Sequence, residues 1–441
     1  MSSIREMDLK YNMHSWTAQS KCTPDVIVKA EGIFLWNDEG KQFYDMSSQL
    51  VNMNLGHGHK KIIKAIQDQA EKLAFINPSF ACDVRSMAAK KIVEIAPGNM
   101  GKVFFTNAGA ESNENAIKIA KLYNGRYKIF SSYRSYHGST YGAGNLTGEP
   151  RRFTNEPGIP GFIKFVAPYT YRAPQAVKFE GEEDAAGYYL EILEDQILYE
   201  GSDKISAIFL ETVVGTNGIL IPPKGYLEGV RALCDKYGIL MVVDEVMSGW
   251  GRTGTWFAIE HFHVQPDMIT FAKGSTCGYV PLGGVIVSKE IAQHFDENVL
   301  HCGLTYSAHP IGCAAAIATL DAYVEENIFD NVKKVGAVLG HILEELKQKH
   351  TSVGDVRYIG LFSSIELVRD KSTREPLVPF GKDPDGIMKK ITCMLKQEGF
   401  LTYTHENMIM VAPPLIITEN QLRDAMTIMD RVLYQVDAMI L

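Results

Sequence analysis

The sequence predicts an α/β protein whose larger part is built on a mostly parallel sheet. Two observations predict it: short apolar runs alternate with helical stretches through the middle of the chain, and this pattern changes near residue 320. Strands that alternate with helices form parallel sheets covered on both faces. Because 441 residues exceed one average domain, we expect a large domain and a smaller one.

The apolar runs have the composition of strands that are buried on both faces. They are rich in β-branched or aromatic residues, and successive positions are apolar without a polar alternation. The last two are joined by a short loop containing Pro and Gly, so one strand there is expected to be antiparallel. The runs are KVFFTN (102–107), YKIFSSY (127–133), IKFVAP (163–168), ISAIFLE (205–211), GILMVVDE (238–245), MITFAK (268–273) and GGVIVS (283–288).

The segments between and after these runs define the expected domains. Residues 226–238, for example, form a helical pattern that ends on Gly238, as a helix C-cap does. Residues 61–320 are therefore predicted to form a large domain with a seven-stranded, mostly parallel sheet. Residues 321–441 carry long amphipathic helical patterns around two strand-like runs and predict a smaller α+β domain. Residues 1–60 are too few for a core of their own and are expected to join that smaller domain.

Composition argues against several classes of partner. Hydrophobic residues make up 46% and charged residues 22%, and the formal net charge is −8 with no block of basic residues. Nucleic acids and anionic membranes are therefore not expected partners. The N-terminus is polar, unlike a secretory signal, and no apolar run reaches membrane-spanning length. Seven cysteines scattered singly fit a reducing cytoplasm better than a disulfide framework or a zinc site.

Two strand ends carry residues that suggest a ligand site. Asn107, Ala108, Gly109 and Ala110 lead from a strand into a helix, where backbone N–H groups and the helix dipole favour an anion. An ordinary strand–helix turn explains them equally well. Asp244 ends a buried strand, where a carboxylate needs a cation or hydrogen-bond donors. A cationic ring nitrogen and nearby backbone N–H groups both remain open as its partners.

Two further strand ends complete the pattern. Tyr136 and His137 follow a strand and could stack on a flat ligand, although core packing is the commoner use of such residues. Lys273 ends another strand and is followed by small residues, at the strand end where open α/β sheets bind ligands. A desolvated lysine has a lowered pKa and can form a Schiff base with an aldehyde. Together the four features match the handling of pyridoxal 5'-phosphate (PLP).

Five sequence motifs carry a family resemblance that runs from about Trp16 to the C-terminus. The chain resembles the class III (ω-amino acid) PLP-dependent aminotransferases of fold type I. The motifs are TNAGAESNENAIKIAK, YHGST, DEVMSGWGRTG, FAKG followed by PLGG, and LTYSAHPIGCAAA.

The resemblance implies roles for the cofactor-binding residues. Lys273 would bind the cofactor covalently and shuttle protons, and Asp244 would keep the pyridine nitrogen protonated. Val246 and Tyr136 would pack on opposite faces of the ring.

Further contacts of the cofactor follow from the same resemblance. The backbone of Gly109 and Ala110 would bind the phosphate, helped by Thr305 of a second subunit, while His137 and Glu211 would also line the cofactor site. Such enzymes are homodimers or dimers of dimers with shared active sites, and no metal is implied.

The substrate side departs from the common family pattern. Many relatives carry an arginine for the substrate α-carboxylate near the C-terminus, but residues 400–418 contain none. His405, Tyr403 or Asn407 could replace it, or another arginine could. Glu211 resembles the family's acidic switch, which screens an arginine when an ω-amine is bound, although a purely local structural role is the alternative.

Two stretches indicate a short ω-amino acid as the amino donor. Trp16 borders the substrate channel in the family, and the loop after Tyr136 supplies Arg151, Arg152 and Arg172, which could equally be solvated surface charges. These stretches look most like the subgroup that acts on taurine and similar donors such as β-alanine. A sulfonate or carboxylate needs a cationic anchor. We predict that Arg152, together with a protonated His405, binds it.

The predicted reaction is transamination of this donor to its aldehyde, with a 2-oxoacid (2-oxoglutarate or pyruvate) as acceptor. The same scaffold also hosts broad amine:pyruvate transaminases, decarboxylases, aminomutases and racemases. A binding protein that keeps the fold without turnover is a further alternative. The presence of both Lys273 and Asp244 argues against it, because a pure binder does not need the ring-nitrogen carboxylate.

Overall fold

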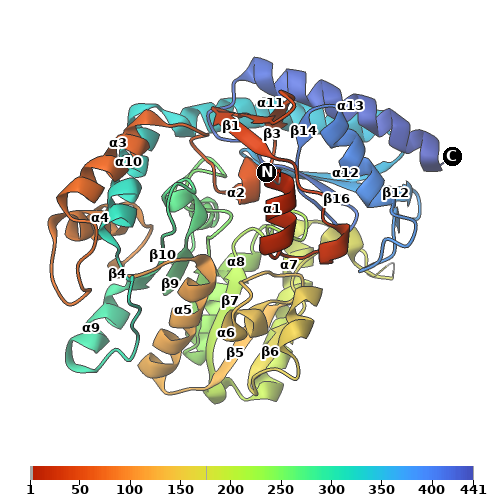
Figure 1. Ribbon diagram of the computed structural model, residues 1–441. Helices are drawn as coiled ribbons and strands as arrows, with labels where there is room; N and C mark the ends of the chain where they lie inside the picture. Colours follow the sequence, from red (N-terminus) through yellow and green to blue (C-terminus); the bar gives the residue numbers. More distant parts are fainter. Residues whose placement is uncertain (1–2, 175, 441) are drawn as a thin grey trace.

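A computed structural model describes residues 3–174 and 176–440 of the chain. Within these residues the largest sheet has seven strands in the order β4-β10-β9-β8-β7-β5-β6 (Figure 1). Strands β5 to β9 pair in parallel, whereas β10 is antiparallel to both of its neighbours. The predicted α/β class, with a mostly parallel seven-stranded sheet, is therefore confirmed. The strands are β4 (Met100–Thr106), β5 (Lys128–Ser132), β6 (Phe162–Phe165), β7 (Ile205–Glu211), β8 (Leu240–Asp244), β9 (Met268–Phe271) and β10 (Gly283–Ser288).

Both faces of this sheet are buried, which explains why its strands lack a polar alternation. Phe209 and Val242 pack with one group of helices, and their neighbours Ile208 and Val243 pack with another. The first group consists of α5 (Gly109–Asn124), α6 (Tyr141–Leu146) and α9 (Lys289–Glu297). The second consists of α4 (Asp83–Ile95), α7 (Glu182–Glu200), α8 (Tyr226–Tyr237) and α10 (Pro310–Glu325).

The C-terminal part of the chain forms a second layered unit around another core. Its sheet contains β11 (Val353–Ile359), β12 (Phe362–Asp370), β13 (Glu375–Pro376), β15 (Thr404–His405) and β16 (Met408–Val411). Its long helices, seen along the top of Figure 1, are α11 (Ile328–Lys349), α12 (Ile387–Gln397) and α13 (Glu419–Ile440). Leu339 of α11 and Met429 of α13 belong to the same apolar cluster.

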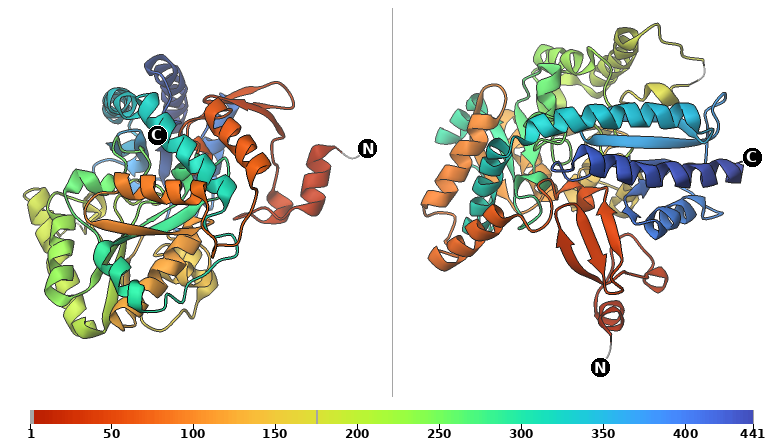
Figure 2. Two further views of the ribbon diagram at one scale, coloured as in Figure 1. Left: turned by 90° about the vertical axis from the view of Figure 1, so that its left-hand side faces the viewer. Right: turned by 90° about the horizontal axis from the view of Figure 1, so that it is seen from above.

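The N-terminal strands join this C-terminal unit. Strand β14 (Phe400–Leu401) pairs in parallel with β3 (Gln42–Asp45), and Ile33 and Met46 belong to the same core as α11 and α13. The domain boundaries themselves remain a prediction. The other N-terminal elements are α1 (Ile4–Tyr11), β1 (Ile27–Glu31), β2 (Phe34–Asn37), α2 (Ser48–Val51) and α3 (Lys60–Lys72). Helix α1 projects from the body of the molecule and buries none of its residues (Figure 2).

Short 3₁₀ turns connect many of these elements. They span Gln19–Lys21, Pro150–Asn155, Thr170–Arg172, Ser202–Lys204, Ala258–Phe262 and Lys273–Ser275. None of the helices in the described residues is both long enough and apolar enough to cross a membrane.

The fully buried Arg252 ties three distant segments together. Its Nη1 donates to the carbonyls of Leu361 (3.0 Å) and Pro413 (2.6 Å). Its Nη2 donates to Ser48 Oγ (3.0 Å) and Asn54 Oδ1 (2.8 Å). Burial lowers the pKa of Arg252 to about 10, which leaves the guanidinium charged at neutral pH. Removing this side chain would leave four buried acceptors without their donor.

We therefore expect Arg252→Ala to lower the free energy of unfolding by about 3 kcal/mol or more, because buried acceptors would lose a charged donor. The apparent thermal midpoint should fall by several degrees. The exposed Arg423, which pairs with Glu419 along α13, is the matched control, and its alanine variant should change the free energy by less than about 0.5 kcal/mol. Equal midpoints for the two variants would contradict this role of Arg252.

Candidate active site

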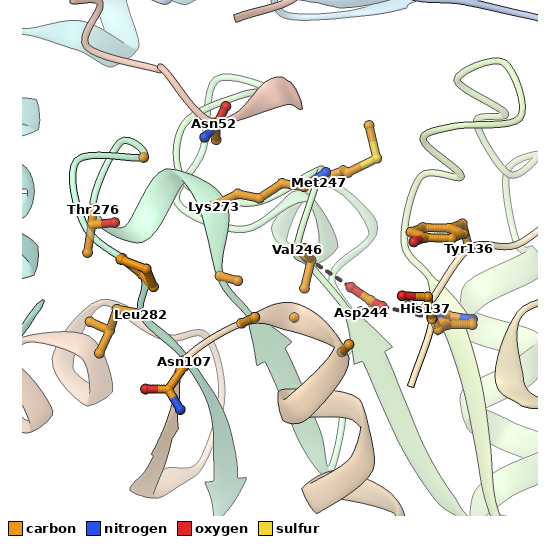
Figure 3. A pocket seen from close by; sticks show the side chains of 18 of the residues that line it. Asn52, Asn107, Tyr136, His137, Asp244, Val246, Met247, Lys273, Thr276 and Leu282 are labelled. Atoms are coloured by element: carbon orange, nitrogen blue, oxygen red, sulfur yellow. Dashed lines mark hydrogen bonds and ion pairs between the residues drawn. The ribbon is translucent and has the colours of Figure 1, made fainter. Parts of the chain in front are cut away.

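A cavity of about 370 Å³ lies at the carboxyl ends of β7, β8 and β9 (Figure 3). This volume falls within the range of small-molecule and cofactor sites, and the carboxyl edge is where open α/β sheets bind ligands. Residues predicted from four separate motifs, together with Glu211, converge here. The predicted residues that line it are Gly109, Ala110, Tyr136, His137, Glu211, Asp244, Val246 and Lys273.

Lys273 begins a 3₁₀ turn directly after β9, with a backbone φ of 46°. This left-handed conformation is uncommon for a residue with a side chain and often marks a functional site. Figure 3 shows its side chain reaching over the end of β8, toward Val246 and Met247. Burial lowers the pKa of Lys273 to about 8, with the charge of Arg151 acting in the same direction and Asp244 opposing it. A large fraction of the amine is therefore neutral, and nucleophilic, near pH 8.

The carboxylate of Asp244 is 3% exposed and is held by three groups. Oδ1 accepts a hydrogen bond from the backbone N–H of Val246 at 2.9 Å. Oδ2 accepts from Asn113 Nδ2 and contacts His137 Nδ1, both at 2.8 Å. Because an ionised carboxylate only accepts, the proton of this contact belongs to Nδ1 of His137. The carboxylate is thus fixed in orientation at the carboxyl end of β8.

Asn113 is a site residue that the sequence analysis missed. It lies one turn into α5, and its Nδ2 also donates to the carbonyl of His137 at 2.8 Å. Its Oδ1 accepts from Thr270 Oγ1 of β9 at 2.9 Å. The sequence did contain a signal for Asn113. It is a polar residue four positions after Gly109, and residues with that spacing lie on the same face of a helix.

The start of α5 is open to an anion. Its N-cap residue is Ala108, and no side chain among the described residues caps this helix. A Cβ atom at Gly109 would lie 2.9 Å from two carbons of Val246, so only glycine allows this close approach. Uncapped N–H groups at a helix start bind phosphate groups well.

These features provide for each part of PLP. The start of α5 suits the phosphate, Asp244 suits a protonated ring nitrogen, Tyr136 and Val246 suit the ring, and Lys273 suits the aldehyde. The described residues therefore fit this cofactor.

Glu211 is buried and fixes the backbone around Tyr136. Its Oε1 accepts from the N–H of Tyr136 and its Oε2 from the N–H of Gly215, both at 2.8 Å. Burial raises the pKa of Glu211 to about 7; His137 opposes this shift and Asp244 adds to it. No arginine pairs with it within the described ranges, so its geometry fits the local structural role more closely than the role of an arginine switch.

Arg151, rather than Arg152, lies against the aromatic ring of the site. The guanidinium carbon of Arg151 is 3.9 Å from the ring centre of Tyr136 and 5.5 Å from that of the largely exposed Trp16. Arg152 lies over Phe153 at 4.6 Å. Its Nη1 donates to a main-chain carbonyl of the same loop at 3.1 Å. The sequence-based choice of Arg152 had no structural basis, because the direction of each of these adjacent arginines depends on the turn of the Pro150–Asn155 segment.

The other predicted anion anchors have different surroundings. His405 stacks on Tyr403, and burial together with Arg151 lowers the pKa of His405 to about 4. It is therefore neutral at pH 7, contrary to the protonated His405 that we predicted. Asn407 bonds both backbone groups of Val378, and Arg172 pairs with a buried glutamate of β12. Asn407 is therefore engaged, whereas Arg172 keeps a buried Nη2 that has no partner among the described residues.

Thr305 is exposed in the loop before α10 and is not among the described residues that line the cavity. Its predicted contact with the phosphate bound by a second subunit remains a prediction.

Comparisons with known proteins identify the family of this chain. Residues 16–433 match the family model described as aminotransferase class III. The structure is similar to that of a taurine:2-oxoglutarate aminotransferase from Bifidobacterium kashiwanohense in complex with PLP and glutamate. The TM-score is 0.96 and the identity 47%, covering 99% of this chain and 98% of that one.

Two curated relatives show that the family includes more than one reaction. The chain is 32% identical to a taurine–pyruvate aminotransferase of Bilophila wadsworthia, over 96% of this chain and 95% of that protein. It is 34% identical to an isoleucine 2-epimerase of Lentilactobacillus buchneri, over 92% and 89%. The family match spans most of the chain, and the predicted fold type I is confirmed by the structural match. This chain belongs to the class III aminotransferases and is a PLP-dependent aminotransferase.

Proposed function

We propose that the protein transfers the amino group of a short ω-amino acid, taurine before others, to a 2-oxoacid. The observation that carries this proposal is the guanidinium of Arg151, which lies on Tyr136 with its Nη2 buried and without a partner among the described residues. Although Arg151 is partly exposed and pairs with Glu149, a buried N–H donor at Nη2 still needs an acceptor, and an anionic oxygen of a substrate would supply it. The sulfonate of taurine, or the carboxylate of β-alanine, is such an anion at a short distance from an amine.

The catalytic steps depend on residues around the cofactor. When bound, PLP supplies an aldehyde that receives the amino group and a ring that withdraws electrons. Lys273 would attach the cofactor and then, as a neutral amine, carry a proton between substrate carbon and cofactor. Asp244 would hold a proton on the ring nitrogen, and His137 and Asn113 keep its carboxylate in place. Tyr136 and Val246 would exclude water from the two ring faces.

The acid group of the substrate would lie near Arg151, beside Tyr136. The stretch 400–418 has no arginine, so the anchor must come from elsewhere, and Arg151 lies between Tyr136 and Trp16. Trp16 would cover the short carbon chain of the donor. The neutral His405 could still donate a hydrogen bond to an oxygen of the acid group.

We further propose 2-oxoglutarate or pyruvate as the acceptor and a homodimer, or a dimer of dimers, as the working form. The similar taurine:2-oxoglutarate aminotransferase contains glutamate with PLP, and the similar curated enzyme is named for pyruvate. Exposed Thr305 would complete the phosphate contacts of the neighbouring subunit.

The lowered pKa of Lys273 predicts how covalent loading of the apoprotein depends on pH. Only the neutral amine attacks the aldehyde, and a pKa of about 8 makes it neutral above that pH. The rate of covalent PLP capture, followed by absorbance after mixing, should rise with pH up to about 8 and then level off. Lys273→Ala should bind PLP only reversibly, so that dialysis removes it. A wild-type rate that rises up to the ordinary lysine pKa of about 10.4 would contradict the buried amine.

Asp244→Asn tests the ring-nitrogen contact while nearly keeping side-chain volume. The neutral amide cannot hold the nitrogen protonated, so kcat should fall by several orders of magnitude, as losses of a preorganised charge do. Cofactor content should be measured in parallel. A loss of less than about tenfold, or ~1.4 kcal/mol, would assign Asp244 a structural role only.

Arg151→Ala should raise KM for taurine and β-alanine roughly ten- to a hundredfold, because a charge-assisted hydrogen bond contributes about 1.5–3 kcal/mol. An uncharged amine such as propylamine should be little affected. Arg152→Ala is the matched comparison, and its KM for taurine should stay near the wild-type value. A taurine-specific loss in Arg152→Ala alone would restore the sequence-based assignment, and equal losses for all amines would exclude an anion anchor at Arg151.

A further inference from the structure

Glu149 contributes a buried carboxylate directly behind Arg151. Its side chain is 2% exposed, and its Oε1 accepts a hydrogen bond from Nε of Arg151. It immediately precedes the 3₁₀ turn Pro150–Asn155 that carries the arginine. The backbone of Glu149 is fixed as well, because its N–H donates to the carbonyl of Ser135 and its C=O accepts from the N–H of Arg152.

Arg151 is the cation that balances this carboxylate. The other basic group near Glu149 is His405, whose Nε2 lies 3.7 Å from Oε2. The low pKa of His405 makes it neutral, so it does not share the charge. Burial raises the pKa of Glu149, and the guanidinium of Arg151 opposes this rise. Burying the carboxylate of Glu149 is tolerable because it is paired with this guanidinium.

The guanidinium of Arg151 is therefore constrained on two sides. Glu149 holds its Nε, and the ring centre of Tyr136 lies 3.9 Å from its central carbon. Nη2, which shares an edge of the guanidinium with Nε, is buried and has no partner within the described residues. A guanidinium presents donors in a rigid fork, so fixing one edge and the plane also fixes the direction of the remaining donors.

We propose that Glu149 is a positioning residue, which directs the free donors of Arg151 toward the acid group of the amino donor and thereby sets the preference for acidic over uncharged amines. This inference rests on the proposed function, in which Arg151 receives that acid group. Glu149 itself touches neither substrate nor cofactor.

A positioning role and a charge-balancing role tolerate different substitutions of Glu149. Glu149→Gln keeps the length and an oxygen acceptor for Nε but removes the charge. Glu149→Asp keeps the charge but shortens the side chain, so that Arg151 must turn to stay paired. Positioning predicts that glutamine is the milder change and aspartate the more harmful one, whereas charge balance predicts the reverse. Glu149→Ala removes both properties.

The experiment uses the PLP-loaded enzyme and two measurements. The first is KM and kcat for taurine and for propylamine. The second is the inhibition constant of ethanesulfonate, a sulfonate that has no amine and cannot react. Glu156→Ala is the control, because Glu156 pairs with Arg152 at 3.5 Å at the end of the same loop and is 54% exposed.

We expect Glu149→Ala and Glu149→Asp to weaken ethanesulfonate binding and to raise KM for taurine about tenfold, as expected when a charged hydrogen bond is misdirected. KM for propylamine should stay near the wild-type value in both variants. Glu149→Gln should remain within about threefold of wild type, given the acceptor it retains. If Glu149→Ala does not fold, the comparison of Glu149→Asp with Glu149→Gln still distinguishes positioning from charge balance.

The inference is overturned if the aspartate variant behaves as wild type, or if all amines lose equally. It is also overturned if glutamine is the more harmful change. The proposed function would fail on different results. It fails if the wild-type enzyme does not use taurine, or if Arg151→Ala affects acidic and uncharged amines equally. If Arg151→Ala loses acidic donors selectively and the Glu149 variants do not, only the role of Glu149 is refuted.

Discussion

The buried carboxylate of Asp244 is the constraint on which the site depends. A carboxylate at the end of a strand that is covered on both faces is unfavourable unless donors surround it. The chain supplies them from three places: the backbone after β8, Asn113 of α5 and His137 after β5. These bonds fix the start of α5 and the Tyr136 segment relative to β8. The surfaces that suit the phosphate, ring and ring nitrogen are thus held by one hydrogen-bonded network.

In the proposed function, an ion pair with a buried carboxylate organises the substrate side. Arg151 and Glu149 lie in the loop after α6, beyond the ring of Tyr136, and the backbone of Tyr136 is itself held by Glu211. The two networks therefore meet at a single aromatic residue. In the proposed function, Tyr136 packs on the cofactor ring and also contacts the guanidinium that would bind the acid group of the donor.

Much of this arrangement could be predicted from the sequence because it depends on local patterns. Unbroken apolar runs such as residues 238–245 indicate strands buried on both faces, and polar residues at their ends indicate a site at the carboxyl edge. Contacts that depend on tertiary direction could not be predicted. The choice between Arg151 and Arg152 depends on one short turn, and the neutral state of His405 depends on burial beside Arg151. Asn113 was missed because a polar residue in a helix ordinarily faces solvent.

The central claim is that the carboxyl edge of the sheet binds PLP through Lys273, opposite the carboxylate of Asp244. The most direct measurement is borohydride reduction of the PLP-loaded enzyme followed by proteolysis and mass mapping of the peptides. Reduction makes the link between lysine and cofactor permanent, so the modified residue can be identified. The account predicts the pyridoxyl group on Lys273, in the peptide that contains FAKGSTCGYVPLGG. A pyridoxyl group on any other lysine, with Lys273 unmodified, would contradict it.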